Sequence, residues 1–499
     1  MITAKIGSRH FELDNKLERY FAPFREQTIG HNQYVQTPFG QKRMIYADWT
    51  ASGRLYRPIE QKLTEELGPF IANTHTESNT VSAMITAAYR HARKKIKEHV
   101  HANEQDILIM DGFGMTSVVN KLQRILGLRL PENWAKRLQL KEEQRPIIFI
   151  SHMEHHSNHT SWLETIGDVR VVQPNKHGHV DIEHLERLLQ RYASRKLKIG
   201  SFTACSNVTG IQTPYHQIAR KMHEHDGYCF VDFAAAAPYT DINMHPADSM
   251  EALDAIFFSP HKFLGGPGSS GVLIFNSKLY KNIVPDHSGG GTVAWTNPWG
   301  KHKYLADIEL REDGGTPGIL QTIKAALCIE LKEQMGTELI HRREQEIVRL
   351  LLSRLEEVPN IRILEKQVTK RLGIISFTFE SLHYHLVVKL LNDHFGYQVR
   401  GGCSCAGTYG HYLLDIDPLE SKLMTDKIDQ GDQTLRRGWV RFSVHPTMTN
   451  AEIYGFVEAL KLIAKHADEW KKDYVYDRIS NEFVYAKGEA RNVDQLFQI

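Results

Sequence analysis

The sequence predicts an α/β protein built around a mostly parallel sheet. Short, nearly continuous apolar runs recur between residues 106 and 275, and segments with helical periodicity separate them. Strands that are apolar on both sides are typical of a sheet covered by helices on both faces. The chain has 499 residues, 41% hydrophobic and 24% charged, which is enough for two or three domains with cores of their own.

Seven apolar runs are expected to form the strands of this sheet. They lie at 106–110, 147–150, 169–172, 198–203, 228–232, 255–258 and 271–275. Helical patterns at 181–193 and 214–225 fall between them. The basic run at 90–101 follows apolar positions at helical spacing, so we interpret it as the solvated face of a helix.

The C-terminal part of the chain predicts a second, smaller unit. A long amphipathic pattern follows the glycine-rich segment 314–318 and extends to about residue 357. Beyond it, apolar runs predict strands at 374–379, 397–400 and 439–444, and a helical pattern runs from about 450 to 465. We therefore expect an N-terminal arm at 1–45, a large domain at 46–325, a connecting helix at 326–357 and a small α+β domain at 358–499.

Composition restricts the possible partners. The 61 basic and 59 acidic residues give a net charge of +2, so no overall field favours nucleic acid or an anionic membrane. Five cysteines without regular spacing argue against a disulfide framework and for a reducing compartment. The first residues lack an apolar signal core, and no run approaches the ~20 apolar residues that cross a bilayer. These observations predict a cytoplasmic protein without nucleic-acid or membrane partners.

Polar and glycine-rich segments follow several of the expected strands, where open parallel sheets bind their ligands. The stretch "DGFGMTS" after the first strand opens a helix, as phosphate-binding turns do. It is not a dinucleotide fingerprint, because that motif would need glycine at Ser117, and a plain strand-to-helix turn remains the alternative. The stretches "SHMEHHSNH" and "ACSNVTG" follow two further strands and add polar groups at the same edge.

Asp232 and Lys262 are the two most informative charged residues. Asp232 ends an apolar strand and is followed by "FAAAAP", so it is either a helix N-cap or the partner of a buried cation. Lys262 lies in "SPHKFLGGPGSSG", directly after another strand. A desolvated lysine has a lowered pKa and can form a Schiff base, and the neighbouring Ser259 and His261 can donate hydrogen bonds to a phosphate.

Pyridoxal 5′-phosphate is a cofactor that uses all of these parts, since it needs a Schiff-base lysine, a carboxylate, a phosphate cup and a stacking surface. Further motifs accompany them in a fixed order: "YADWTASG" (46–53), "NTHTESN" (73–79), "GMTSVVN" (114–120), "MEHHSN" (153–158), "SNVTG" (206–210), "VDFAAA" (231–236), "GGG" (289–291), "GGTPG" (314–318), "VRGGCSCAG" (399–407) and "VRFSVHPTMT" (440–449). With these motifs the chain resembles the class V aminotransferases of fold type I, and within them the cysteine desulfurase and selenocysteine lyase group. The resemblance implies the fold of the PLP-dependent transferases of fold type I, with a seven-stranded, mostly parallel sheet.

The resemblance also implies roles for individual residues. Lys262 would be the Schiff-base lysine and proton carrier, Asp232 the partner of the pyridinium nitrogen, and His155 the imidazole stacked on the ring. Asn207 would lie near the cofactor hydroxyl and the substrate carboxylate. The positions that match the phosphate cup are Gly114, Met115, Thr116, Ser259 and His261. Those that match substrate contacts are Arg441, Arg400 and His75.

Thr316 in "GGTPG" matches a threonine that reaches the phosphate from the other subunit, so a homodimer with shared sites is implied. A metal centre is the rival chemistry, because His152, His155, His156 and His159 have helical spacing. No convincing set of carboxylates or cysteines accompanies these histidines, and we expect no metal.

The segment "VRGGCSCAG" (399–407) indicates which reaction of the family to expect. In desulfurases a loop cysteine takes the sulfur of the amino-acid substrate as a persulfide, and Cys405 matches that position, with Cys403 beside it. We expect desulfuration of L-cysteine or a selenium analogue, with a possible sulfur-acceptor protein. The alternatives are a class V aminotransferase or lyase acting on another amino acid, with Cys405 incidental, and a sulfur-delivery scaffold.

Two departures from the family pattern stand out. Ala235 occupies the place of the usual glutamine or histidine beside the cofactor hydroxyl. The interval of 36 positions from Cys405 to Arg441 is longer than in simple bacterial desulfurases. In this respect the chain is more similar to the desulfurase domain of molybdenum cofactor sulfurases.

Overall fold

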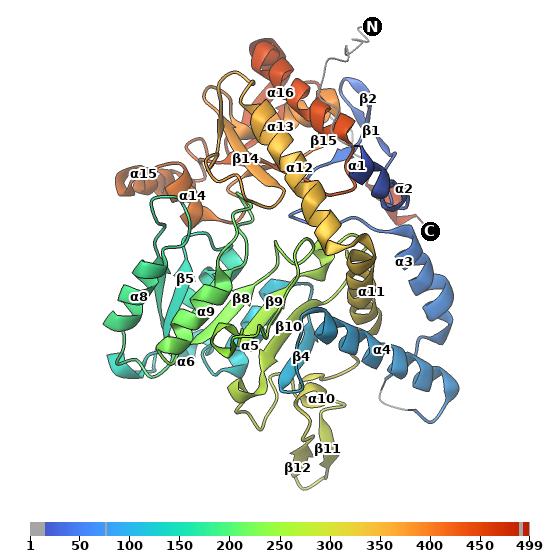
Figure 1. Ribbon diagram of the computed structural model, residues 1–499, viewed down its shortest axis with the longest axis vertical. Coiled ribbons are helices and arrows are strands. Elements are labelled where there is room, and N and C mark those ends of the chain that lie inside the picture. The colour runs from blue at the N-terminus through green and yellow to red at the C-terminus, as the bar shows by residue number, and fades with distance from the viewer. Residues whose placement is uncertain (1–14, 75–76, 489–492, 499) are drawn as a thin grey trace.

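A seven-stranded mixed sheet occupies the centre of the larger half of the molecule (Figure 1). The computed structural model describes residues 15–74, 77–488 and 493–498. The strands lie in the order β4 (Asp106–Asp111), β10 (Gly271–Asn276), β9 (Ala255–Phe258), β8 (Tyr228–Asp232), β7 (Lys198–Thr203), β5 (Ile147–Ser151) and β6 (Asp168–Val172). The run from β9 to β6 is parallel, whereas β10 is antiparallel to both of its neighbours. The seven apolar runs of the sequence are thus confirmed as the seven strands.

Helices cover both faces of this sheet, as expected. Along β5, Ile147 and Phe149 join one hydrophobic cluster, while Ile148 and Ile150 join another on the opposite face. The first cluster includes buried residues of α4 (Thr80–His99), α8 (Ile182–Arg191), α9 (Tyr215–Glu224) and α11 (Ile319–Met335), and the second includes those of α5 (Met115–Ile125) and α7 (Thr160–Leu163). Because a strand alternates its side chains, one apolar run supplies both cores.

A second, four-stranded antiparallel sheet forms the smaller half. Its order is β13 (Ile361–Ile363), β14 (Ile374–Phe379), β17 (Trp439–Ser443) and β16 (Arg400–Gly402). The helices α12 (Thr337–Leu355), α13 (Tyr384–Leu390) and α16 (Asn450–Trp470) lie beside it (Figure 1). The long interval between β16 and β17 contains α14 (Gly407–Leu413) and α15 (Pro418–Asp429). The hairpin β18 (Tyr474–Asp477) and β19 (Glu482–Tyr485) follows α16.

Two expectations for this region need correction. The single connecting helix predicted at 326–357 is two helices, α11 and α12, because Gly336 between them adopts a left-handed φ of 75°. The single strand predicted at 397–400 is two short strands. β15 (Tyr397–Gln398) pairs in parallel with β3 (Ile45–Tyr46), and β16 pairs with β17. The N-terminal segment supplies this strand partner, which no local pattern at 397–400 indicates.

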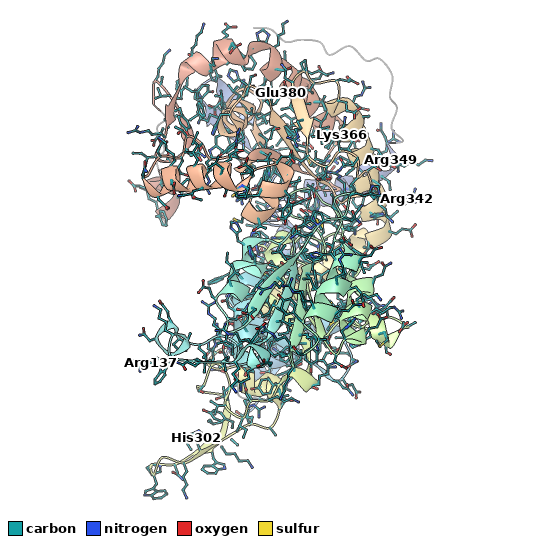
Figure 2. All side chains as sticks on the ribbon, turned by 90° about the vertical axis from the view of Figure 1, so that its left-hand side faces the viewer. Arg137, His302, Arg342, Arg349, Lys366 and Glu380 are labelled. Carbon is teal, nitrogen blue, oxygen red and sulfur yellow. The ribbon has the colours of Figure 1, made fainter. Side chains whose placement is uncertain are left out.

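The remaining elements are short. They are α1 (Lys16–Tyr20), α2 (Ala22–Glu26), α3 (Arg57–Gln61), α6 (Glu132–Ala135), α10 (Ile308–Glu312) and the hairpin β1 (Tyr34–Thr37) with β2 (Gly40–Arg43). A second hairpin, β11 (Val293–Thr296) with β12 (His302–Tyr304), projects away from the rest of the molecule (Figure 2). No helix within the described residues combines the length and apolarity needed to cross a bilayer.

Candidate active site

A cavity of about 200 Å³ lies at the carboxyl edge of the parallel strands, between the large sheet and the small sheet. Segments that follow β4, β5, β7, β8 and β9 line it, together with residues of the small sheet and residues 50 and 51. Ten of the residues singled out in the sequence meet here: Met115, Thr116, His155, Asn207, Asp232, Ser259, His261, Lys262, Arg400 and Arg441.

The other expected site residues lie elsewhere. Gly114 directly precedes Met115 and lies beside the lining residues Ser259 and His261, which a Cβ placed on it would meet. Cys405 is exposed and does not line the cavity, although Ser404 beside it does. Thr316 is exposed and lies outside the cavity lining of its own chain. His75 falls outside the described residues.

Lys262 ends a 3₁₀ turn, Pro260–Lys262, that directly follows β9 and Ser259. The glycines after it permit close packing, since a Cβ on Gly266 would lie 1.8 Å from the Pro260 carbonyl oxygen. Burial lowers the pKa of Lys262 to about 8 although the Asp232 carboxylate favours the charged amine; Arg441 and Arg400 act in the same direction as burial. The lysine is therefore poised as a nucleophilic amine.

Asp232 and His155 flank this lysine in the cavity lining. Asp232 is 3% exposed and accepts the Ala234 N–H at 2.8 Å, and burial raises its pKa to about 6. Burial, assisted by the Lys262 charge, lowers the pKa of His155 to about 3, so its imidazole is neutral. The Nδ1 atom of His155 accepts the Ser157 N–H at 3.1 Å, which orients the ring. A neutral imidazole and a buried carboxylate suit an aromatic ring that carries a protonated nitrogen.

The N-terminus of α5 forms a cradle at one end of the cavity. The Met115 N–H donates to Ser259 Oγ at 2.8 Å, and Thr116 Oγ1 lies 2.6 Å from Ser157 Oγ. A Cβ on Gly114 would lie 2.9 Å from Ser259 Oγ and 3.4 Å from His261 Nε2, so only glycine leaves this space open. Helix N-termini with nearby hydroxyls bind phosphate, which is what this cradle offers.

Two arginines also line the cavity, and one aspartate pairs with both of them. The buried Arg441 of β17 donates to Asp48 Oδ1 at 2.5 Å and to the Asn207 carbonyl at 3.0 Å. Arg400 Nε lies 3.2 Å from Asp48 Oδ2. Two cations against one carboxylate leave one positive charge for a ligand carboxylate.

Three buried polar atoms around the cavity have no hydrogen-bond partner among the described residues: Asn207 Oδ1, Arg441 Nε and Thr50 Oγ1. Orphaned buried polar groups are costly in a folded protein, and a ligand commonly satisfies them. With the open cradle and the lysine, these atoms suit a polar, anionic ligand.

The sequence analysis did not single out Thr203, which lines the cavity, or Glu154 and Asp48, which bond to lining residues. Glu154 is 2% exposed and accepts the Ser151 Oγ hydrogen at 2.5 Å, the Asn158 amide at 2.7 Å and the Thr203 N–H at 2.9 Å. Burial raises its pKa to about 7. Thr203 ends β7 and Glu154 follows β5. Both could have been found as Asp232 was, by inspecting the polar residues at the carboxyl ends of the strands. Asp48 could not, because its partner Arg441 is 393 positions away.

The two cysteines of the loop differ in exposure. Cys405 is exposed, whereas Cys403 is partly buried against the hydrophobic core. Cys205, Cys229 and Cys328 are buried, and burial raises the pKa of each of these thiols. Cys405 is therefore the most accessible thiol of the described chain, and its loop borders the cavity through Ser404.

The four histidines of 152–159 do not converge on one point. His155 lines the cavity, whereas the other three contact the segment 405–412. Within the described ranges, no group of three histidine, cysteine, aspartate or glutamate side chains could hold a metal ion.

Known proteins with similar sequences identify the family of this chain. The family model described as "Aminotransferase class-V" matches residues 45–456. The chain is 28% identical over 367 residues to a probable cysteine desulfurase of Halalkalibacterium halodurans, covering 73% of this chain and 84% of that protein. It is 27% identical over 369 residues to a probable cysteine desulfurase of Streptomyces coelicolor, with the same coverage.

Solved structures share the fold. The apo cysteine desulfurase of Thermococcus onnurineus NA1 superposes with a TM-score of 0.70 at 22% identity, covering 89% of this chain and 98% of that chain. The cysteine desulfurase CsdA of Escherichia coli gives a TM-score of 0.68 at 21% identity, covering 90% and 98%. The mixed seven-stranded sheet and its helices are therefore those of the PLP-dependent enzymes of fold type I.

Proposed function

Because the chain belongs to the class V aminotransferase family, we propose that it is a cysteine desulfurase, which removes sulfur from L-cysteine or selenium from its analogue. Members of this family use pyridoxal 5′-phosphate, and the chain is an enzyme of that cofactor class. The observation that carries the proposal is the exposed Cys405, next to Ser404 in the wall of the cavity that holds Lys262.

The cavity residues fit this cofactor. The cradle of Gly114, Met115, Thr116, Ser259 and His261 would hold its phosphate. Asp232 would hold the proton on its ring nitrogen, His155 would cover one ring face, and the free oxygen of Asn207 would meet a ring substituent. When bound, the cofactor supplies an electron sink for the carbanion formed on the substrate.

The chain's own groups would perform the remaining steps. Arg441 and Arg400 bind the substrate carboxylate, and the orphaned Nε of Arg441 supplies a ready donor. The Lys262 amine, with its lowered pKa, accepts the substrate Cα proton and later returns it. The Cys405 thiolate attacks the substrate sulfur, so that an S–S bond forms as the C–S bond breaks and its electron pair stays with Cβ. Protonation at carbon then gives alanine, and Cys405 carries the persulfide.

The homodimer belongs to the same proposal. Thr316 is exposed and lies outside the cavity lining of its own chain, as expected of a residue that serves the site of a second subunit. An exposed Cys405 can also pass its sulfur to an acceptor protein. Five unpaired thiols suit a reducing compartment, and we place the enzyme in the cytoplasm.

The deciding experiment compares Cys405→Ser with Cys403→Ser. In Cys405→Ser we expect substrate still to change the cofactor spectrum, because Lys262, Asp232 and Arg441 remain, while sulfide and persulfide output falls at least about 100-fold, since serine oxygen cannot take sulfane sulfur. Cys403→Ser should be milder. Brief treatment of the wild type with L-cysteine should add one sulfur to the peptide that contains "GGCSCAG", detectable by mass spectrometry. Full activity of the double variant on the best substrate would instead favour an aminotransferase or another lyase.

A further inference from the structure

Three histidines of the segment 152–159 hold the segment that carries Cys405. His156 forms two hydrogen bonds with the main chain of this segment, one from its own N–H and one through its side-chain Nε2, and His159 Nδ1 bonds Thr408 Oγ1 at 3.2 Å. The His152 ring meets the rings of Tyr409 and Tyr412 edge to face, at centroid distances of 5.4 and 5.5 Å. The loop that carries Cys405 and the helix α14 that follows it therefore both contact residues 152–159.

His156 makes the contacts nearest to the thiol. Its N–H donates to the Cys405 carbonyl at 2.7 Å, and its Nε2 accepts the Gly407 N–H at 2.9 Å. A Cβ on Gly407 would lie 3.2 Å from Nε2, so the absence of a side chain allows this approach. The two bonds bracket Ala406 and fix the main chain on both sides of it.

The conformation held in this way is a strained one. Ser404 and Cys405 both have left-handed φ values, 51° and 55°, which cost non-glycine residues about 1 kcal/mol or more each. From the cavity side, Asn207 Nδ2 donates to the Ser404 carbonyl at 2.7 Å, and Trp439 Nε1 donates to Ser404 Oγ at 3.2 Å. The loop therefore depends on its neighbours for its shape.

We propose that His156 is a positioning residue that sets the place of the Cys405 sulfur relative to the cavity, an inference that rests on the proposed function. His155 faces the cavity and His156 faces the loop, and the two adjoin at the start of the 3₁₀ turn His156–Asn158. One short turn thereby connects His155, which would cover the cofactor ring, with His156, which holds the loop of Cys405.

The contact requires a neutral His156, because a protonated Nε2 cannot accept the Gly407 N–H. Burial lowers the pKa of His156, and Arg436 acts in the same direction. The contact is therefore complete above the ordinary histidine value of 6.5 and weakens as the pH falls through the lowered pKa. Within the described part of the chain, His155 and His159 interact electrostatically with His156, and the Cys405 carbonyl accepts its N–H. His411 Nδ1 lies 2.8 Å from the carbonyl oxygen of Gly407, the residue whose N–H His156 accepts.

The test compares His156→Gln, whose amide oxygen can still accept the Gly407 N–H, with His156→Leu, which cannot. The control is His383→Leu, which removes an imidazole that accepts the His385 N–H at 3.2 Å, away from the cavity lining. The readouts on the cofactor-loaded enzyme are hydrogen exchange at the Gly407 amide, alkylation of Cys405 by iodoacetamide, the cofactor absorbance and persulfide formation in a single turnover.

In His156→Leu we expect Gly407 to exchange about tenfold faster and persulfide to form about tenfold more slowly, the effect of losing one main-chain hydrogen bond. Cysteine alkylation and the cofactor absorbance should stay within about twofold, because the thiol is already exposed. His156→Gln should stay within about threefold of the wild type. It should keep Gly407 protection as the pH is lowered from 7.5 through the lowered pKa of His156, whereas the wild type should lose protection below the ordinary histidine value of 6.5.

Unchanged exchange in His156→Leu would show that the contact does not hold the loop. Faster exchange with unchanged persulfide formation would leave His156 a structural role only and overturn the proposal. A third outcome is that the wild type forms no persulfide from L-cysteine while exchange at Gly407 still becomes faster in His156→Leu. The proposed function then fails, and with it the proposal that His156 positions the Cys405 sulfur.

Discussion

Lys262 lies where burial and two arginines oppose its charge and Asp232 supports it. With a pKa of about 8 instead of 10.5, about a tenth of the amine is unprotonated at pH 7. That fraction is large enough for the amine to react with an aldehyde at neutral pH, which a surface lysine does slowly.

We expect the rate at which cofactor-free protein captures pyridoxal 5′-phosphate to rise with pH, to reach half of its maximum near pH 8 and to level off about one pH unit higher, where most of the amine is neutral. Stopped-flow absorbance measures the rate, and borohydride reduction followed by peptide mapping should place the adduct on Lys262. Lys262→Ala should form no adduct but should retain some noncovalent cofactor in the cradle. A rate that still climbs at pH 10 would contradict the lowered pKa.

Of the two roles left open in the sequence for Asp232, the helix N-cap is wrong, because the residues that follow form a turn and not a helix. Its Oδ1 atom accepts the Ala234 N–H within this turn, and its charge acts on the Lys262 amine. The hydrogen bond and the charge can be separated, because asparagine keeps the acceptor and removes the charge.

In Asp232→Asn we expect cofactor affinity to fall by the ~1.5 to 3 kcal/mol of a charge-assisted hydrogen bond, and turnover to fall much further because the ring loses its proton. Cofactor titration and steady-state rates measure the two effects separately. Near-normal turnover would mean that the carboxylate serves only to hold the turn that follows β8.

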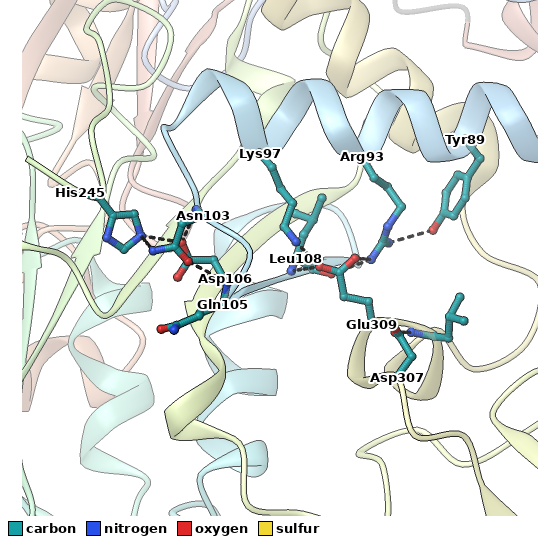
Figure 3. Close-up of polar contacts among 11 residues, drawn as sticks. Tyr89, Arg93, Lys97, Asn103, Gln105, Asp106, Leu108, His245, Asp307 and Glu309 are labelled. Atoms are coloured by element: carbon teal, nitrogen blue, oxygen red, sulfur yellow. Dashed lines mark hydrogen bonds and ion pairs between the residues drawn. The ribbon is translucent and has the colours of Figure 1, made fainter.

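At the scale of elements, one carboxylate joins helix α4, helix α10 and strand β4 (Figure 3). Glu309 Oε2 accepts from Arg93 at 2.9 Å, and Oε1 accepts from Lys97 at 2.6 Å and from the Leu108 N–H at 2.8 Å. Burial favours protonation of Glu309, but Arg93 and the hydrogen bonds outweigh it, so the pKa is lowered. This contact holds the first edge of the large sheet against its covering helix.

Glu309→Gln should destabilise the protein by about 1 to 3 kcal/mol, because Arg93 and Lys97 then lose the charge of their shared partner. Thermal unfolding followed by circular dichroism checks this, with Glu330→Gln as the control, since Glu330 pairs with Lys95 on the exposed side of α4 at 3.8 Å. The lowered pKa makes the contribution complete above about pH 4.5 and lost as the pH falls further. Equal melting temperatures for the two variants would show that the network adds nothing.

At the scale of the whole molecule, the cavity lining of one chain includes neither Thr316 nor the projecting hairpin β11–β12 (Figures 1 and 2). Trp295 and Trp299 of this hairpin are 48% and 82% exposed, which is unusual for large aromatic side chains. The proposed homodimer would place its second subunit against this part of the chain.

Mixing Lys262→Ala subunits with Thr316→Val subunits tests shared sites. In a mixed dimer with shared sites, one site combines an intact Lys262 with an intact Thr316 of the other chain, so activity should exceed that of either parent. Sedimentation should give twice the chain mass. A monomer, or a mixture no more active than the average of its parents, would exclude a shared site.

The sequence by itself determined the large sheet and most of the cavity. The seven strands are local apolar runs, and the strand-end rule places Asp232, Asn207 and Lys262 at one edge, because parallel strands deliver their carboxyl ends together. The helix expected at 450–465 is likewise present as α16. These features depend on residues that are close together in the chain, so the local sequence pattern predicts them.

Only the tertiary structure decided the contacts between distant segments. It brought Asp48 to Arg441, divided the expected strand at 397–400 between β3 and β17, and set His156 against the loop of Cys405, about 250 positions away. It also divided the expected connecting helix at Gly336, where the amphipathic pattern continues but the backbone turns left-handed. Such pairings depend on how the packed layers close on one another, because the hydrogen bonds that hold them have no local signature in either partner.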